Sequence, residues 1–188
     1  MGLAMPMWFP AHLALGYLLG VRSRLLLGWC LLGAALPDII DKSLGLSGVL
    51  PAYQTVSHSI FGLVVVVTAL HTAVDDSTYR AGVAFAVGWL SHLGADLFQL
   101  TLDGRVAHAA GMLGWPMTHW SNPMVDGSAP GYTDTLLSWL PFLSEGYVAQ
   151  YLSSASFPIE LLVCLAALAL FVTDRYRKPQ ATAGQSRR

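Results

Sequence analysis

Long apolar runs, separated by short polar turns, follow one another through the first half of the chain and return near its C-terminus. Each run is bounded by charged residues or by a stretch with Gly or Pro, as expected for helices that end at a boundary with water. The five runs cover residues 7–20, 25–36, 58–73, 80–100 and 157–172. The pattern predicts an all-α, polytopic membrane helical bundle of about five helices.

The first two runs are shorter than the others. A helix needs roughly 20 residues to cross a hydrocarbon core, so we expect these runs either to form a tight helical hairpin, partly shielded by the other helices, or to begin within the headgroup region. A cleaved signal peptide is the alternative for the first run. However, His12 interrupts its apolar sequence, and Arg22 and Arg24 follow the run instead of preceding it.

The composition also indicates a bilayer as the solvent. Of the 188 residues, 54% are hydrophobic and only 11% are charged, which is unlike an ordinary globular protein. We expect one membrane-embedded domain over residues 1–174 and a basic, disordered cytoplasmic tail over residues 175–188. The formal net charge is −1 and the basic residues cluster only in that tail, which argues against a nucleic-acid partner.

The basic residues predict an orientation in the membrane. If the five helices alternate in direction, all ten Lys and Arg residues except Lys42 and Arg105 fall on one side. The positive-inside rule then places the N-terminus outside and the C-terminus in the cytoplasm of a multi-pass cell-membrane protein. Residues 101–156, rich in Gly, Pro, Ser and aromatics, would form an extracytoplasmic cap segment, with a short helix over residues 133–143.

Several Asp and His side chains interrupt or end the apolar runs. Such groups are costly to hold away from water unless each is paired, hydrogen-bonded or bound to a metal. The orientation, which rests on Lys and Arg alone, brings them to the same outer face, so a second observation indicates a common site. The candidate metal ligands are His12, Asp38, Asp41, His58, His92 and Asp96. This mixture of imidazole and carboxylate donors favours a divalent cation, zinc above others.

Two pairs within this set have helical spacing. His92 and Asp96 are four residues apart and share one helix face, where they either bind one ion or hydrogen-bond to each other. Asp38 and Asp41 are three residues apart and would repel each other without a cation between them. In the alternative, Asp38 is a helix N-cap and Asp41 is a solvated partner of Lys42. The spacing does not decide which aspartate is the main ligand.

The remaining candidates are interpreted from their surroundings. His58 stands between two serines at the entrance of an apolar run, where capping explains the serines but not the imidazole. His12, alone on an apolar face, is either a core histidine or a ligand. Glu160 lies in the first turn of the last run, where the helix dipole favours it without a metal, and it is also a candidate general base or ligand. His119, in the cap segment, is a candidate for proton transfer, metal binding or substrate binding. The expected bystanders are His71 and His108.

These motifs, in this order, resemble the YdjM-like family of inner-membrane, metal-dependent hydrolases. The matching pieces are His-Leu-Ala-Leu-Gly from His12, Leu-Pro-Asp-Ile-Ile-Asp-Lys at 36–42, Ser-His-Ser at 57–59 and Ser-His-Leu-Gly-Ala-Asp at 91–96. The resemblance spans residues 11–100, with looser similarity to the end of the chain. It implies a membrane-embedded helical bundle with a metal-dependent hydrolase activity.

The ligand order is also similar to that of the zinc-dependent phospholipase C and single-strand nuclease group. Carried over by position, this resemblance implies zinc ligands at His12, Asp41 or Asp38, His58, His92 and Asp96. That group also has a His-x3-Glu pair and an N-terminal Trp ligand, whereas this chain offers only His119 and Glu160, far apart in sequence. The resemblance therefore implies one or two ions instead of a three-metal cluster.

These observations favour a membrane-bound hydrolase in which one or two divalent ions act on an ester or phosphoester at the outer membrane face. A site at the membrane boundary, under an aromatic cap segment, suits an amphiphilic, lipid-like substrate, so membrane lipids are the expected partners. A metal-ion or proton transporter would use the same donors, but they gather on one face and no inverted repeat is visible. The third alternative is a non-catalytic membrane scaffold whose polar residues brace its helices.

Overall fold

The computed structural model of the chain is helical wherever it has regular structure. It describes residues 8–47, 49–50, 54–73, 79–102, 104–118, 152 and 154–183. The helices in these ranges are α1 (Phe9–Arg22), α2 (Leu27–Leu46), α3 (Ile60–Ala73), α4 (Tyr79–Leu102), α5 (Val106–Gly114) and α7 (Phe157–Ala183). No strand occurs in the described part of the chain, and the all-α prediction is confirmed.

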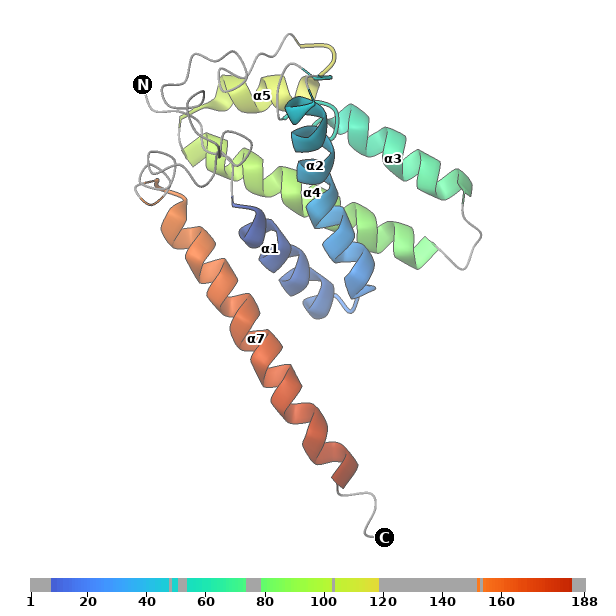
Figure 1. Cartoon of the computed structure of the whole chain (residues 1–188), viewed down its shortest axis with the longest axis vertical. Helices are drawn as coiled ribbons and strands as arrows, with labels where there is room; N and C mark the ends of the chain where they lie inside the picture. The colour runs from blue at the N-terminus through green and yellow to red at the C-terminus, as the bar shows by residue number, and fades with distance from the viewer. Residues whose placement is uncertain are drawn as a thin grey trace.

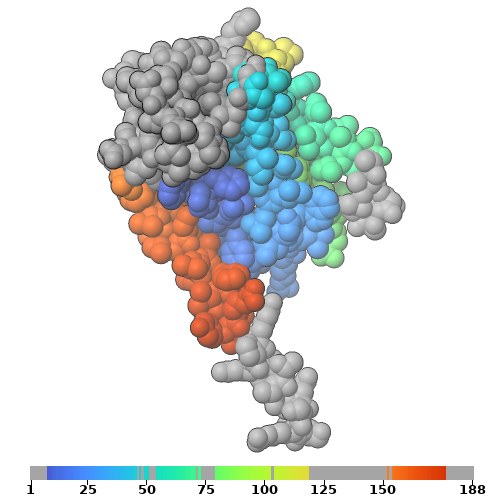
Figure 2. Space-filling model, in the orientation of Figure 1, coloured from blue at the N-terminus to red at the C-terminus, as the bar shows by residue number. Residues whose placement is uncertain are grey.

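Helix α4 is the centre of the arrangement (Figure 1). Its most extensive packing is against α2, which crosses it, and it also contacts α1, α3 and α5. On the other side of the bundle α1 packs against both α2 and α7. Figure 2 shows α7, in orange and red, along the flank of the molecule next to α1. The chain therefore brings α1, α2 and α4 together at one place, and the candidate ligands lie on these helices.

Glycines allow α2 and α4 to approach until their backbones touch. A Cβ atom on Gly33 of α2 would lie 2.1 Å from the carbonyl oxygen of Phe85, and one on Gly88 of α4 would lie 2.0 Å from the carbonyl oxygen of Cys30. Neither position accepts a side chain without moving a backbone, as at the close helix crossings of membrane proteins. The close approach places His92, one turn beyond Gly88, directly against α2.

Two of the helices are long and apolar enough to cross a membrane, counting only described residues. They are α4 and, over Phe157–Tyr176, α7; α3 has a shorter apolar stretch, Ile60–Leu70. All five runs predicted from the sequence are helical, but five membrane spans are not confirmed. The reason is length in α1 and α3, which have 14 residues each, and polarity in α2, whose C-terminal half carries two aspartates and a lysine.

Helix α2 is longer than the sequence predicts. The apolar run ends at residue 36, but the helix continues through Pro37 to Leu46. Pro37 has no N–H, so the carbonyl of Gly33 lacks its usual helical partner, a cost that tertiary packing offsets here. The result places Asp38 and Asp41 inside a helix, one turn apart, instead of at its end. Asp38 is therefore not the helix N-cap of the alternative interpretation.

The C-terminal half also differs from the predicted boundaries. Within the predicted cap segment, the structure shows a helix, α5, that no sequence pattern predicted. Most of the remaining cap segment, with His119 and the predicted helix at 133–143, lies outside the described residues. Helix α7 continues to Ala183, into the segment that the sequence assigns to a disordered tail. Arg and Lys are good helix formers, so a helix leaving an apolar region continues through them at little cost.

Candidate metal centre

The six candidate ligands meet at one place, as the orientation argument predicts. His12 comes from α1, Asp38 and Asp41 from α2, His92 and Asp96 from α4, and His58 from the turn before α3. Each of the six residues is 2% exposed or less. Six ionisable groups buried together need compensating partners, and their contacts show where these partners are.

Asp41 is saturated by donors from the turn that carries His58. Its Oδ2 accepts hydrogen bonds from the backbone N–H of Thr55 at 2.6 Å and from His58 Nδ1 at 2.8 Å, and its Oδ1 accepts one from the N–H of Ser57 at 3.1 Å. The backbone N–H of His58 also reaches Oδ2, at 3.3 Å. Asp41 thus fixes the turn and the ring, with the Nε2 of His58 directed away from it.

His58 carries a strong preference for a positive charge. Burial lowers the pKa of its imidazole, but contacts with the Asp38 and Asp41 carboxylates outweigh burial and raise the pKa to about 9. A proton on Nε2 supplies that charge when nothing else does. A metal ion at the same nitrogen would supply it equally well, because the surrounding carboxylates respond to any cation.

The ring of His92 is oriented by the backbone. Its Nδ1 lies 2.8 Å from the carbonyl oxygen of Ala34 in α2. A carbonyl only accepts hydrogen bonds, so Nδ1 carries the proton and Nε2 presents a lone pair when the ring is neutral. The Nε2 atoms of His92 and His58 lie 3.1 Å apart. Two lone pairs at this distance repel each other unless a proton or a metal ion lies between them.

Two carboxylates complete the surroundings of this nitrogen pair. Asp38 Oδ1 lies 3.5 Å from Nε2 of His58 and 3.9 Å from Nε2 of His92. Asp96 Oδ2 lies 3.4 Å and 3.7 Å from the same two atoms. Tetrahedral zinc, with bonds of about 2.0–2.2 Å, separates its ligand atoms by roughly 3.3–3.6 Å. Asp38, His58 and His92, whose donor atoms lie 3.1–3.9 Å apart, form one of the two groups of three described residues able to hold a metal ion.

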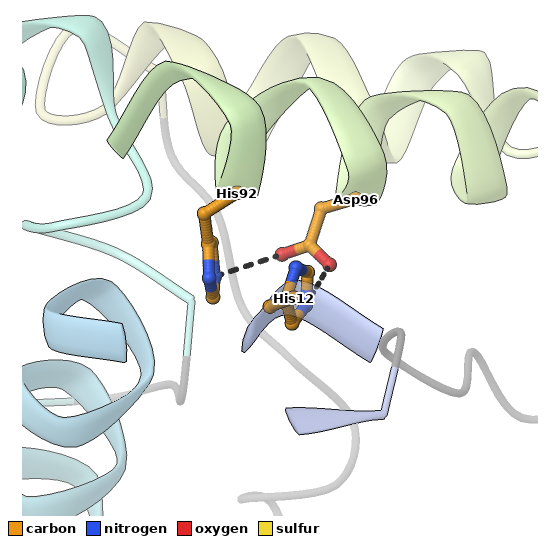
Figure 3. A group of neighbouring side chains, drawn as sticks. All are labelled: His12, His92 and Asp96. Atoms are coloured by element: carbon orange, nitrogen blue, oxygen red, sulfur yellow. Dashed lines mark ion pairs between the residues drawn. The ribbon is translucent and has the colours of Figure 1, made fainter. Parts of the chain in front are cut away.

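The second group extends the site toward α1. Figure 3 shows His92 and Asp96 projecting from α4 toward His12, with Asp96 in contact with both histidines. The rings of His12 and His92 stack with centroids 3.7 Å apart, and His12 Nε2 lies 3.3 Å from Asp96 Oδ1. Neither ring nitrogen of His12 makes a hydrogen bond within the described structure. Asp96 therefore offers one oxygen to each side of the site.

Two residues that the sequence did not single out as site residues hold these carboxylates. Gln54 Nε2 donates to Asp96 Oδ2 at 3.1 Å, and Lys42 Nζ donates to Asp38 Oδ2 at 2.6 Å. In the alternative interpretation Lys42 paired with Asp41, but its partner is Asp38, one turn away on α2. The four-residue spacing of Asp38 and Lys42 is a usable signal for that pair. Nothing in the sequence near Gln54 predicts its contact.

The two predicted proton-transfer residues, Glu160 and His119, are not among the donors of the centre described above. Glu160 is buried in the first turn of α7, and its Oε2 accepts a hydrogen bond from the backbone N–H of Trp8 at 3.0 Å, at the start of α1. It belongs to neither group of donors. His119 lies outside the described residues.

His108 lies on α5, which packs against α4. Burial and the neighbouring Arg105 lower the pKa of His108 to about 4, against an opposing effect of the Asp96 carboxylate. His108 belongs to neither group of donors, and its assignment as a bystander stays a prediction. His71, near the far end of α3 from His58, has no described side chain.

Comparison with known proteins gives one result. The sequence model of the family described as YdjM inner membrane protein matches residues 7–178. No curated protein and no solved structure shows a significant match. The matched range includes every donor of the centre and both helices that are long enough to cross a membrane.

Proposed function

Because the chain belongs to the YdjM inner membrane protein family, we propose that it is a membrane-bound, metal-dependent hydrolase. It cleaves an ester or phosphoester of a lipid-like substrate at the outer membrane face. The observation that carries the proposal is the pair of Nε2 atoms 3.1 Å apart, on two histidines whose Nδ1 atoms both have acceptors. Such a pair, between two carboxylates, is suited to a divalent cation.

The contacts divide the six residues into roles. Asp38, His58 and His92 would hold the central ion with its fourth tetrahedral position open, and zinc is the best fit to two imidazoles and a carboxylate. Asp96 belongs to the second group of donors, with His92 and His12. Asp41 is a positioning residue for His58, since its oxygens are already occupied by hydrogen bonds. His12 faces the second oxygen of Asp96; it either binds a second ion together with His92 and Asp96 or accepts a proton at Nδ1.

The chemistry follows from this division. A divalent ion held by Asp38, His58 and His92 would supply a bound water of lowered pKa and Lewis-acid polarisation of the scissile ester. Because His12 Nε2 faces the Asp96 carboxylate, which accepts hydrogen bonds, the neutral ring has its lone pair on Nδ1, the nitrogen that would accept a proton from the reacting water. His119 and Glu160 are the further proton-transfer residues of the proposal. Glu160 accepts a hydrogen bond from the backbone of Trp8, which lies one helical turn before His12.

The surface next to the site supports a lipid-like substrate. Helix α3 begins two residues after His58, and its first residues, Ile60 and Phe61, are 56% and 52% exposed. Val64 and Val65, one turn further, are exposed as well. This apolar surface adjoins a polar centre, as an amphiphilic substrate requires.

Metal content is the direct test of this proposal. The full-length protein is purified in detergent, and bound metal per chain is measured for the wild type, His92→Ala and Asp38→Ala. We expect near-stoichiometric metal in the wild type and loss of metal in both variants, since each loses one of three ligands. His71→Ala is the matched control, because residue 71 is at the opposite end of α3 from His58. Unchanged metal content in both site variants would refute the centre.

Activity then separates the hydrolase from a carrier. The metal-loaded protein is offered a panel of lipid esters and phosphoesters, and the two variants are tested in parallel. We expect turnover in the wild type that falls with metal content in the variants. Ion flux into liposomes without turnover of any ester would favour the metal-ion or proton transporter.

A further inference from the structure

Lys42 contacts the buried centre and is itself partly exposed to solvent. Its side chain is 39% exposed, whereas that of its partner Asp38 is 3% exposed and that of His58 is fully buried. A molecule that approaches from solvent on this side meets the Lys42 ammonium before it meets the donors behind it. The exposed position distinguishes Lys42 from the ligands themselves.

Asp38 connects Lys42 to the proposed ion. Its Oδ2 contacts Lys42 Nζ at 2.6 Å, and its Oδ1 faces the nitrogen pair of His58 and His92. A single carboxylate group therefore separates the ammonium from the ion position. A phosphate group also presents two oxygens side by side, so it can contact the ion through one oxygen and Lys42 through another.

The charges in contact at the site leave Lys42 available for this contact. With an ion at Oδ1, Asp38 shares its negative charge between two cations, and its hold on Lys42 weakens. The ammonium can then pair with an incoming anion at small cost, because it is already partly in water.

We propose that Lys42 is the anion-binding residue of this centre, and that the substrate is a phosphoester whose charged phosphate contacts Lys42 and the metal ion together. The assignment of a phosphoester rests on the proposed function, but the binding of phosphate does not. It narrows the substrate class from esters in general to anionic phosphoesters. A neutral carboxylic ester offers Lys42 no charge to recognise.

The test measures phosphate binding without turnover. The full-length protein is loaded with zinc in detergent, and the affinity for inorganic phosphate is measured by calorimetry for the wild type, Lys42→Met and Lys42→Arg. We expect Lys42→Met to weaken binding by roughly ten- to a hundredfold, the usual effect of losing one charge-assisted contact, and Lys42→Arg to stay within about threefold. Arg80→Met, an exposed cation at the opposite end of α4 from Asp96, is the control and should bind as the wild type does.

Metal content and the pattern of substrates decide between the outcomes. Equal phosphate affinity in Lys42→Met and wild type would overturn the proposal. So would a loss of zinc in Lys42→Met with unchanged phosphate affinity in the loaded fraction, because Lys42 would then only position Asp38. Detergent-solubilised phosphatidic acid that competes with phosphate at lower concentration than glycerol phosphate would identify a lipid headgroup as the source, and equal competition a free phosphate.

The same variants distinguish this inference from the proposed function. If phosphate binding depends on Lys42 but no ester is cleaved, the hydrolase proposal fails and the anion site stands. If esters are cleaved and Lys42→Met reduces kcat/KM equally for a neutral carboxylic ester and an anionic phosphoester, the hydrolase stands and the anion site fails. A loss confined to the phosphoester, mainly in KM, supports both.

Discussion

The crossing of α2 and α4 and the outer face of α7 are opposites in chemistry. At the crossing, the Asp and His residues are 2% exposed or less. Along α7, large apolar side chains are 40% exposed or more: Leu161, Leu162, Leu165, Leu168, Phe171 and Val172. A water-soluble helical protein has the reverse arrangement. The comparison teaches that this chain buries its polar groups where they contact one another and exposes apolar groups, the arrangement expected of a protein whose solvent is lipid.

The largest expected effect comes from removing the residue that contacts most of the buried site. Asp96→Ala leaves His12, His58 and Gln54 without one of their contacts. We expect metal affinity to fall at least a hundredfold and the free energy of unfolding to fall by about 3–5 kcal/mol, as when one partner of a buried ionic network is lost. Metal titration and thermal unfolding in detergent measure both. Asp174→Ala, a carboxylate of α7, is the control, and an equal effect there would contradict the comparison.

A second change opens the crossing without touching a donor. In Gly88→Ala, the new methyl group would lie 2.0 Å from the backbone oxygen of Cys30, so α2 and α4 must move apart. We expect a loss of about 2–3 kcal/mol in stability, typical of overpacking, together with weaker metal binding. Gly94→Ala, on the same helix, has no neighbour within 4 Å and should lose neither stability nor metal. Similar behaviour of the two variants would show that close approach does not position the site.

A third change distinguishes ligand from positioning residue. Asp41→Asn keeps the shape of the side chain but removes the charge that holds His58 Nδ1 and the turn at Thr55. We expect the same number of ions per chain, with affinity reduced by about ten- to a hundredfold, the range for losing a partner that orients a ligand. Equilibrium titration against a chelator of known affinity measures this. A lower number of ions per chain would make Asp41 a ligand after all.

The smallest effect is expected on α7. Leu165→Ala removes an apolar side chain that is 51% exposed, so stability in detergent should change by no more than about 0.5 kcal/mol. Metal content should not change. Leu165→Asp, at the same position, should reduce the membrane-inserted fraction in cells, because a carboxylate in lipid is costly. Full insertion of Leu165→Asp would show that this face does not meet lipid.

The helices that follow from apolar runs could be predicted from the sequence. All five apolar runs became helices, three of them with nearly the predicted bounds, whereas α2 and α7 continue well past their predicted ends. The predicted convergence of His12, Asp38, His58, His92 and Asp96 is what the structure shows. Orientation from Lys and Arg was sufficient for that convergence, because helices that alternate in direction bring corresponding ends together. The membrane face itself stays a prediction, as does the orientation of the termini.

Features that depend on tertiary contacts could not be predicted from the sequence. The continuation of α2 through Pro37 conflicts with local preference and is offset by packing against α4. The choice between Asp38 and Asp41 depends on which carboxylate the His58 turn covers, and a three-residue spacing carries no such information. Gln54 contacts Asp96 across 42 positions of sequence, with no motif around it. Helix α5 has only nine residues, too few to be distinguished in sequence from the Gly- and Pro-containing segment around it.

The two facing histidines are secured by different kinds of acceptor. His58 depends on a single side chain, Asp41, whereas His92 is tethered to the main-chain oxygen of Ala34. A point mutation can remove a carboxylate, but it cannot remove a backbone carbonyl. Substitutions at position 34 would therefore keep this contact, and they are restricted by the close packing of Ala34 against Gly16. The orientation of His58 therefore depends on the identity of residue 41, whereas the orientation of His92 depends on the backbone path of α2. Divergent relatives would be expected to keep the orientation of His92 longer than that of His58.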